Sequence, residues 1–408
     1  MKKIILIFLL LSGCNKVEVE KTFEVDIYKQ TSSEICIKTD DNVYQYKIEN
    51  NEKSGTFERD ICFDNLEKNT EYIITISNDQ TSKEMVLKTE DTIIFRFGGD
   101  TTMSDFFGDA LNNYGSNYMF EDIVDLLLEA DYSFLNLETS VSDRGISTKP
   151  AGYGFRSDPK HLESLVNAGI DMVLLANNHV LDYGYDAFLD TLENLEKNEI
   201  EYIGAGENYE SASKVKYVDI KGKKIGFFGA NSVIPNDGWI ATSEKGGIMP
   251  LKDEYFEEII DLLKKAKEEC DYLFAVFHWG REYVNYPDDW QVGFSEKLID
   301  AGVDFIIGSH PHVLQGVDIN KQNAIFYSTG NLVFYFNTDD SKLTALFELE
   351  IDNSGIVSSR VYPIRINNLK ANLLKKEDSL FKEIIGNLNT RSKGFETTIN
   401  EDGVIILE

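Results

Sequence analysis

From about residue 92 onward, apolar runs typical of β-strands alternate with stretches of helical periodicity. The first three are the strand-like TIIFRFGGD, the helical FEDIVDLLLEA and the strand-like YSFLNLE. The pattern continues through HLESLVNAGI, DMVLLANNH, EYFEEIIDLLKKAKEEC, DYLFAVFHWG and DFIIGSHPH. Such alternation is typical of α/β architecture. The sequence therefore predicts an α/β domain over residues 92–408.

The preceding segment, residues 15–91, has a different pattern. Short alternating runs such as FEVDIYK, SEICIKT and EYIITISN are separated by polar turns about every ten residues, which is typical of a small antiparallel sandwich. NLEKNTEYIITISN resembles the corner before the sixth strand of a fibronectin type III domain, with Leu66, Thr70 and Tyr72 in matching positions. We interpret this segment as a small all-β spacer domain.

Residues 1–14 have the features of a bacterial export signal. Two lysines precede a run of about nine apolar residues, too short to span a bilayer but suited to a signal-peptide core. LSGC resembles a lipobox, which predicts cleavage before Cys14 and a lipid on its sulfur. The alternative is an ordinary secretory signal with an incidental cysteine. No other stretch is apolar enough to cross a membrane, so we expect an exported protein held at the cell membrane or surface by its lipid anchor alone.

Three further cysteines remain. Cys36 and Cys62 both lie in strand-like alternations that point them away from the apolar face of their strands. They could pair across neighbouring strands in an oxidising compartment, or remain two free thiols, and the sequence leaves both open. Cys270 lies where a helix meets a strand and is interpreted as a small buried residue.

The charge balance restricts the partners. With 70 acidic and 40 basic residues, the chain carries a formal net charge of −30. This charge repels nucleic acids and anionic lipid surfaces, so we expect no nucleic-acid partner. An anionic substrate would need a local positive centre, such as a metal ion.

Five apolar runs of the α/β region end directly in polar residues. In α/β sheets, ligands gather outside the carboxyl ends of the strands. Four of the chain's five histidines lie at these ends, and their mixture of nitrogen and oxygen donors suits a divalent Mn, Fe or Zn ion. The alternative is that each end is a structural turn. The polar ends contain Asp100, Glu138, Asn178, His179, His278, His310 and His312.

Six ordered blocks carry a family resemblance. FRFGGDTTM, FLNLETSVS, ANNHVLDYG, FHWGREYVNYP, IIGSHPHVLQG and FYSTGNLVF together resemble the CapA family of poly-γ-glutamate capsule proteins over residues 94–336. The resemblance implies a calcineurin-like metallophosphatase fold. The expected architecture is thus a four-layer α/β/β/α sandwich preceded by the small fibronectin- or immunoglobulin-like domain.

The resemblance also implies roles for individual residues at a metal site. Asn177 replaces a glycine of the pattern. Thr102 stands where the pattern has a histidine, and the loss of this histidine favours one ion or two of unequal affinity. The implied metal ligands are Asp100, Glu138, Asn178, His278, His310 and His312.

Further residues are candidates for catalysis and substrate binding. His179 matches the proposed proton donor, which Asp182 would orient unless it instead caps the following helix. Glu282 is a candidate orienting group or general base. The candidate substrate contacts are Arg144, Arg156, Trp279, Tyr283, Ser328 and Asn331, of which the arginines and aromatics are equally plausible as surface or packing residues.

Three functions are compatible with these residues. The first is a metal-dependent phosphatase-like enzyme of capsule biosynthesis that hydrolyses or transfers a phosphoryl or acyl-type bond. The second is a non-catalytic accessory protein for export or anchoring of the polymer. The third is metal-independent acid–base chemistry, since a peptide epimerase resembles this family. The expected partners are an anionic polymer or a small phosphorylated or peptidic substrate, together with membrane-bound polyglutamate synthase components.

Overall fold

The computed structural model describes residues 23–49, 51, 53–150, 153–335 and 338–407. The chain forms two compact units. The first runs to Thr92 and includes Ile351–Gly355, and the second comprises Ile93–Glu350 and Ile356–Glu408. The predicted signal segment and Cys14 lie outside the described residues. Within the described part of the chain, no helix has the length and apolar character needed to cross a membrane.

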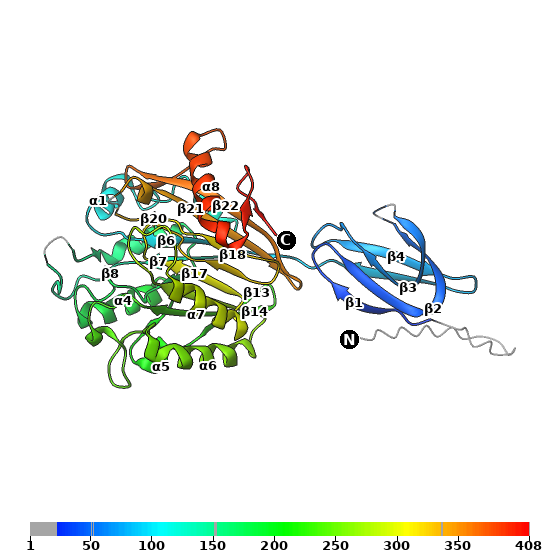
Figure 1. The fold of residues 1–408 in the computed structure, drawn as a ribbon, viewed down its shortest axis with the longest axis horizontal. Coiled ribbons are helices and arrows are strands. Elements are labelled where there is room, and N and C mark those ends of the chain that lie inside the picture. Colours follow the sequence, from blue (N-terminus) through cyan, green and yellow to red (C-terminus); the bar gives the residue numbers. More distant parts are fainter. Residues whose placement is uncertain (1–22, 50, 52, 151–152, 336–337, 408) are drawn as a thin grey trace. The chain divides into compact units, whose positions relative to one another are not determined.

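The first unit is built from antiparallel strands, as the alternating sequence predicts (Figure 1). The sheet order is β1-β2-β4-β5, and β3 also pairs with the long β2. Strand β2 therefore pairs with three strands, and β5 joins the same sheet through β4. Its apolar core includes Ile35, Tyr44 and Ile74. The strands are β1 (Asp26–Gln30), β2 (Ile35–Ile48), β3 (Ser54–Phe63), β4 (Glu71–Ser77) and β5 (Ser82–Lys88).

This unit contains a disulfide and a tyrosine hydrogen bond at a strand corner. Cys36 and Cys62 lie directly opposite each other on β2 and β3 and form a disulfide. Cys36 is fully buried whereas Cys62 is exposed, so the face of the sheet opposite the apolar core is itself partly covered. At the predicted corner, the Tyr72 hydroxyl accepts a hydrogen bond from the backbone N–H of Glu67 at 2.7 Å.

The second unit contains a mixed sheet whose order is β11-β10-β7-β6-β21-β22-β23, with β20 also paired to β6. The strands from β11 to β6 run parallel, as does β20 beside β6, while β22 and β23 are antiparallel. Its strands are β6 (Ile93–Thr101), β7 (Tyr132–Leu137), β10 (Met172–Leu174), β11 (Glu201–Ile203), β20 (Asn331–Val333), β21 (Leu343–Asp352), β22 (Gly355–Asn367) and β23 (Lys370–Leu373).

A second mixed sheet has the order β13-β14-β16-β17-β19-β18. Its central pairs are parallel and both edge pairs are antiparallel. Its strands are β13 (Lys216–Ile220), β14 (Lys223–Asn231), β16 (Tyr272–His278), β17 (Phe305–Ser309), β18 (Val317–Ile319) and β19 (Ala324–Phe326). Short pairs join β8 (Ser140–Val141) to β9 (Arg156–Ser157), β12 (Ala205–Gly206) to β15 (Gly247–Ile248), and β24 (Thr398–Ile399) to β25 (Ile405–Ile406).

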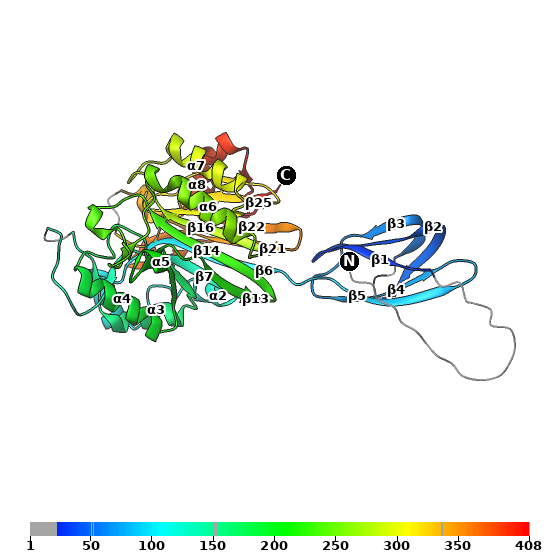
Figure 2. The same cartoon turned by 90° about the horizontal axis from the view of Figure 1, so that it is seen from below.

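Aromatic side chains pack the two sheets of this unit against each other. Ring centroids of Phe95 on β6 and Phe274 on β16 are 4.8 Å apart, and those of Tyr132 on β7 and Phe227 on β14 are 5.3 Å apart. Helix α4 contacts β11 of the sheet that contains β6, and α6 contacts β14 and β16 of the sheet that contains β17. Helices therefore cover both sheets of the second unit (Figure 2). The mixed α/β class is confirmed.

The helices occupy the connections between these strands. The α-helices are α1 (Asp105–Tyr114), α2 (Val124–Leu128), α3 (Leu162–Asn167), α4 (Tyr185–Lys197), α5 (Tyr209–Ala212), α6 (Phe256–Lys267), α7 (Asp289–Asp300) and α8 (Ser379–Ser392). The 3-10 helices are η1 (Pro159–His161), η2 (Asp237–Trp239), η3 (Asp253–Tyr255), η4 (Asp340–Lys342) and η5 (Lys393–Phe395).

Candidate metal and proton-transfer site

Strands from both sheets bring the proposed metal ligands together at their carboxyl ends. Asp100 lies at the end of β6 and His278 at the end of β16. Glu138 and His310 directly follow β7 and β17, and Asn178 lies four residues after the end of β10. Each proposed ligand is at most 9% exposed. The rings of His278 and His310 have centroids 4.7 Å apart, although the two residues are 32 positions apart in the chain (310 − 278). The cluster is therefore a product of the fold and not of one local turn.

The donor atoms lie close enough to share ions. One ligand atom from each of Glu138, His278 and His310 lies within 4.8 Å of the others, and the same holds for Asp100, Glu138 and His312. Nitrogen and oxygen ligands of Zn²⁺ lie about 2.0–2.2 Å from the ion, so ligands of one ion are separated by at most about 4.4 Å. Because Glu138 belongs to both groups, the geometry suits one ion or two neighbouring ions that share this carboxylate.

Hydrogen bonds hold Asp100 and His312 in place. Asp100 accepts hydrogen bonds from the Asn136 side chain at 2.7 Å and from the backbone N–H of His310 at 3.3 Å. Nδ1 of His312 lies 2.9 Å from both Asp100 Oδ2 and Asn331 Oδ1. Burial alone would lower the pKa of His312, but the hydrogen bond and charge of Asp100 outweigh it and the pKa is raised.

Buried atoms without partners test whether the cluster fits a cation. Oε1 of Glu138 and Nδ1 of His310 are buried and have no hydrogen-bond partner among the described residues. Burial, aided by His312, lowers the pKa of His310 to about 3, which leaves a neutral imidazole with a lone pair available. Burial and the neighbouring Asp100 raise the pKa of Glu138. A cation between the two carboxylates would relieve the electrostatic repulsion between them. The donor set therefore fits a divalent metal ion.

The two histidines after β17 have unusual backbone angles. His310 has φ of 95° and His312 has φ of 57°, on either side of Pro311. Residues other than glycine seldom adopt such positive φ angles. Strained backbone of this kind persists where the surrounding structure holds it, and here it directs both imidazoles toward the acidic side chains.

His179 stands beside the cluster as part of a separate pair. Its Nδ1 lies 2.6 Å from Asp182 Oδ2, and its Nε2 lies 3.7 Å from Glu138 Oε1, so Nε2 faces the proposed ligands. Burial lowers the pKa of His179 and the hydrogen bond to Asp182 partly opposes this. Asp182 also accepts the backbone N–H of Phe155 at 2.9 Å, whereas Gly184 occupies the N-cap of α4. The contacts of Asp182 thus match an orienting role and not the capping one.

Four other candidate residues lie close to the cluster or support it. A carboxylate oxygen of the exposed Glu282 lies within 4.8 Å of ligand atoms of His310 and His312, and the Tyr283 ring is 6.0 Å from that of His312. Asn331 contacts His312 directly, as described above. Ser328 donates to the carbonyl of Val313 at 2.8 Å and so stabilises the turn beneath the histidines.

Three proposed substrate contacts have other partners. Trp279 is fully buried in the core and donates its indole N–H to the carbonyl of Tyr327 at 2.9 Å, which matches the packing alternative and not a position in a cleft. Arg144 forms an ion pair with Asp190 at 3.2 Å. The guanidinium of Arg156 lies 4.4 Å from the ring centroid of Tyr183.

Thr102 occupies the position where the family pattern has a histidine. It is buried, and its hydroxyl lies 3.0 Å from that of Ser104.

The structure adds residues that the sequence analysis did not assign. Asn136 Nδ2 lies 3.3 Å from Glu138 Oε2 and 3.1 Å from His278 Nδ1, in addition to its bond to Asp100. Asn177 donates to Asn136 Oδ1 at 3.2 Å and accepts the backbone N–H of His179 at 3.1 Å. A signal for Asn136 exists, because residues two apart in a strand share a face and Asn136 precedes Glu138 by two.

One side of the site beyond His179 is basic and aromatic. Nζ of Lys149 lies 3.4 Å from Asp182 Oδ1 and 3.3 Å from the carbonyl oxygen of Asn178. The ring centroid of Phe155 lies 4.3 Å from that of His179 and 5.0 Å from that of Tyr335. Nothing in the loop sequence STKPAGYGF marks Lys149 for this position.

The clustered side chains lie within the part of the chain that matches a known protein family. The family described as "Bacterial capsule synthesis protein PGA_cap" matches residues 94–336, a range that contains every clustered side chain. The capsule biosynthesis protein CapA of Bacillus anthracis is 30% identical over 272 residues, which is 66% of this chain and 66% of that protein, slightly under two thirds. The PGA biosynthesis protein CapA of Bacillus subtilis (strain 168) is 28% identical over 321 residues, or 78% of this chain and 83% of that protein.

Two more distant similarities are also found. A probable polyglutamine synthesis accessory protein of Mycobacterium tuberculosis (strain H37Rv) is 26% identical over 268 residues, covering 61% of this chain and 70% of that protein. Among solved structures, the NAD nucleotidase of Haemophilus influenzae aligns with a TM-score of 0.41 and 12% identity, over 73% of this chain and 62% of that one. With its match over residues 94–336, the chain belongs to the PGA_cap family of bacterial capsule synthesis proteins.

Proposed function

We propose that this chain takes part in making or exporting a poly-γ-glutamate-type capsule polymer and carries a metal-dependent hydrolase or transferase site. The names of the two Bacillus relatives, a capsule biosynthesis protein and a PGA biosynthesis protein, support the biological role. The observation that carries the chemical role is the buried cluster of mixed nitrogen and oxygen donors, with the His179–Asp182 pair beside it. The proposed reaction is hydrolysis or transfer of a phosphoryl or acyl-type bond.

The metal would be held by Asp100 and the donors around it. A bound divalent ion supplies a water whose pKa is lowered toward about 7 and a positive centre for an oxyanion. Mn, Fe and Zn all accept such a ligand set. The proposed ligand set is Asp100, Glu138, Asn178, His278, His310 and His312, of which Asn178 is placed by its Oδ1, 2.9 Å from His278 Nε2.

His179 would exchange a proton with the substrate at Nε2. Its Nδ1–H donates to Asp182, which fixes the ring orientation and leaves Nε2 directed at the cluster. An imidazole held in this way can protonate a leaving group or accept a proton from an attacking one. Asp182 is itself held by the backbone of Phe155 and by Lys149, so the ring has little freedom to turn away.

Lys149 and the neighbouring aromatic rings suit recognition of an anionic chain. The Lys149 ammonium provides a local positive charge in a protein whose formal net charge is −30. The Phe155 and Tyr335 rings are stacked beside His179 and would exclude water from one side of the substrate. An anionic polymer or a small phosphorylated or peptidic compound is the substrate class we propose.

The proposal extends to the whole chain. Residues 1–14 serve as a lipoprotein signal, Cys14 carries the lipid, and residues 15–91 act as a fibronectin-like spacer. Residues 92–408 form a four-layer α/β/β/α metallophosphatase-like domain, which the two facing sheets and their covering helices support. The protein then acts on the outer side of the membrane beside the membrane-bound polyglutamate synthase.

One other function has a specific observation in its favour. The Mycobacterium tuberculosis relative is described as an accessory protein of polymer synthesis, which favours a non-catalytic role in export or anchoring. In that case the buried cluster would hold a structural ion and the protein would bind polymer without breaking any bond.

Two histidine variants separate these functions. His310→Gln removes a proposed ligand, and His161→Gln serves as the control because His161 is a buried histidine bonded to Asn112, outside the cluster. We expect the purified full chain to contain a divalent metal and to hydrolyse a generic phosphodiester in a chelator-sensitive way. His310→Gln should lower both metal content and activity, the latter at least about 100-fold, and His161→Gln should change neither.

Other results would contradict the enzymatic proposal. A metal-loaded wild-type protein that cleaves neither phosphoryl nor acyl-type model substrates, but binds polyglutamate, would support the accessory role. Activity that persists after chelation and in His310→Gln would favour metal-independent acid–base chemistry.

A further inference from the structure

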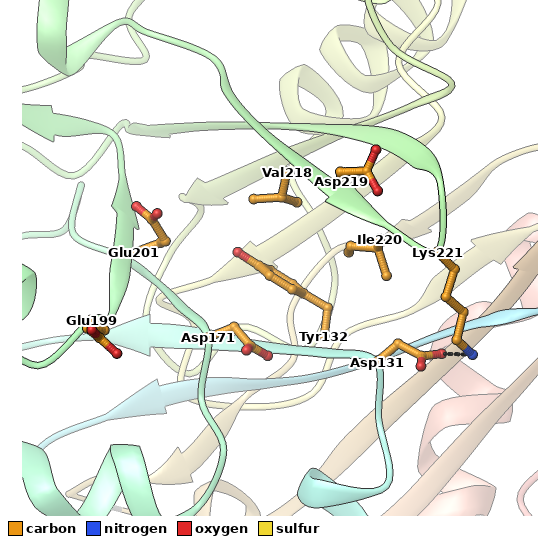
Figure 3. Close-up of a pocket in the computed structure, with 9 residues that line it drawn as sticks. All are labelled: Asp131, Tyr132, Asp171, Glu199, Glu201, Val218, Asp219, Ile220 and Lys221. Carbon is orange, nitrogen blue, oxygen red and sulfur yellow. Dashed lines mark ion pairs between the residues drawn. The ribbon is translucent and has the colours of Figure 1, made fainter.

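A pocket of about 590 Å³ opens at the opposite end of the parallel strands, away from the metal cluster. Asp131 directly precedes β7 and Asp171 directly precedes β10, while Glu201 begins β11. The proposed ligands Glu138 and Asn178 follow the other ends of β7 and β10. This amino-end pocket is therefore a separate feature of the second unit (Figure 3).

The lining of the amino-end pocket is strongly acidic. Five carboxylates and a single lysine, Lys221, belong to it. Lys221 forms an ion pair with Asp131 at 2.8 Å, and Lys216 from outside the lining pairs with Glu201. The acidic side chains outnumber these lysines, so the pocket has a negative potential that attracts cations. The five are Asp131, Asp171, Glu199, Glu201 and Asp219.

A buried tyrosine hydroxyl points into the same space. Tyr132 is only 8% exposed, and its ring stacks against Phe227 at 5.3 Å. Its hydroxyl is buried and has no hydrogen-bond partner among the described residues. Figure 3 shows the ring reaching between the acidic side chains with the hydroxyl directed toward Glu201. A buried hydroxyl without a partner costs free energy, and a ligand that bonds to it would recover that cost.

The spacing of the carboxylates argues against a single metal ion. The groups of described residues whose donor atoms lie close enough to share one ion do not include these side chains. The acids extend instead along the starts of β7, β10 and β11 and the end of β13, where Asp219 lies. An extended cation with several separate charges matches this arrangement better than a compact ion.

We propose that the amino-end pocket binds a small organic diamine or polyamine. One ammonium group lies near Tyr132, Asp171 and Glu201, where it donates hydrogen bonds to the phenol oxygen and to a carboxylate. A second ammonium group lies toward Asp219 at the mouth of the pocket. An ammonium has three donors and no acceptor, which complements a lining made of carboxylate and hydroxyl oxygens.

Calorimetric titration of the full chain with spermidine tests this proposal. We expect saturable binding at 0.15 M salt, weakened about tenfold in Tyr132→Phe, which keeps the ring and removes the hydroxyl. Asp171→Asn should weaken binding by a similar factor. Glu257→Gln, which removes an exposed acid on α6 outside the pocket, is the matched control and should bind like the wild type.

The outcomes distinguish this site from general attraction to an acidic protein. Equal weakening in Glu257→Gln and Asp171→Asn, or unchanged binding in both Tyr132→Phe and Asp171→Asn, would overturn the proposal. Displacement of spermidine by Mg²⁺ at matched ionic strength would also overturn it, in favour of a metal ion. The same titration is repeated with a tetralysine peptide. Tighter binding of this peptide than of spermidine would overturn the assignment to a small molecule.

Discussion

The two ends of strand β7 offer ligands of different kinds. At its carboxyl end, Asn136 and Glu138 are buried among imidazoles and a second carboxylate, and these groups lie within a few ångströms of one another. At its amino end, Asp131 and Tyr132 belong to a wider set of oxygen atoms without any histidine. Both ends are acidic, so charge alone does not distinguish them. The difference lies in spacing and donor type, which suit a compact metal ion at one end and an extended organic cation at the other.

Removal of metal should have the largest effect, and only at the carboxyl end. If the ion is present at about 100 times its dissociation constant, chelation lowers the free energy of unfolding by about 2.7 kcal/mol. Urea titrations with and without a chelator measure this difference. Spermidine binding at the amino-end pocket should be unaffected. Unchanged stability after the metal has been shown to leave would contradict a bound ion in the cluster.

Asp182→Asn tests whether the proton-transfer pair acts separately from the ligands. We expect kcat on a phosphodiester to fall about tenfold, equivalent to ~1.4 kcal/mol, because His179 loses its charged partner. KM and metal content should stay the same, since Asp182 is not among the proposed ligands. Asp186→Asn, an exposed change in the first turn of α4, is the control. Loss of metal in Asp182→Asn would show that the residue supports the cluster and not the proton transfer.

Tyr132→Phe should stabilise the protein when no amine is present. The change removes a buried hydroxyl that lacks a partner and keeps the stacking on Phe227, so we expect a gain of up to about 1 kcal/mol. Tyr72→Phe in the first unit is the matched comparison, because its hydroxyl accepts the N–H of Glu67 and its removal should destabilise by about 1 kcal/mol. Thermal unfolding of both variants measures the contrast, and equal losses would mean that the Tyr132 hydroxyl has a partner in solution.

The smallest effect concerns the pH dependence at the amino end. Burial raises the pKa of Asp171 above 3.8, although backbone N–H groups partly oppose this. The folded state therefore binds the proton more tightly than the unfolded state, and this contribution to stability is lost as pH rises from 3.8 through the folded pKa. Asp171→Asn should thus gain stability relative to the wild type between pH 4 and 7, measured by urea titration. A difference that instead grows toward acid pH would reverse the sign of this prediction.

The sequence predicts the main architecture because its local patterns agree with the fold. The strand and helix alternation after residue 92 appears as two mixed sheets with covering helices, and the short alternating runs before it form the antiparallel unit. What the pattern did not supply is the pairing of strands. It gave no indication, for example, that β20 lies beside β6 and brings Asn331 to His312.

The proposed ligands could be expected to lie close together because backbone geometry leaves little choice there. Polar residues that end parallel strands meet at one edge, so the proposed ligands converge. The same geometry favours the packing alternative for Trp279, because neighbouring residues of a strand face opposite sides and His278 already faces the cluster. Lys149 was not predictable, since its position depends on how a loop folds over Asp182 and no periodicity governs that loop.

The left-handed backbone at His310 and His312 has a consequence for transplanting this cluster into another protein. Each such angle costs on the order of 1–3 kcal/mol in a residue other than glycine, and a host framework would have to supply the packing that tolerates it. Copying the imidazoles onto a relaxed hairpin would aim them elsewhere. A transplanted site would therefore need the whole Ser-His-Pro-His turn, with its positive φ angles, and the strand and loop that pack against it.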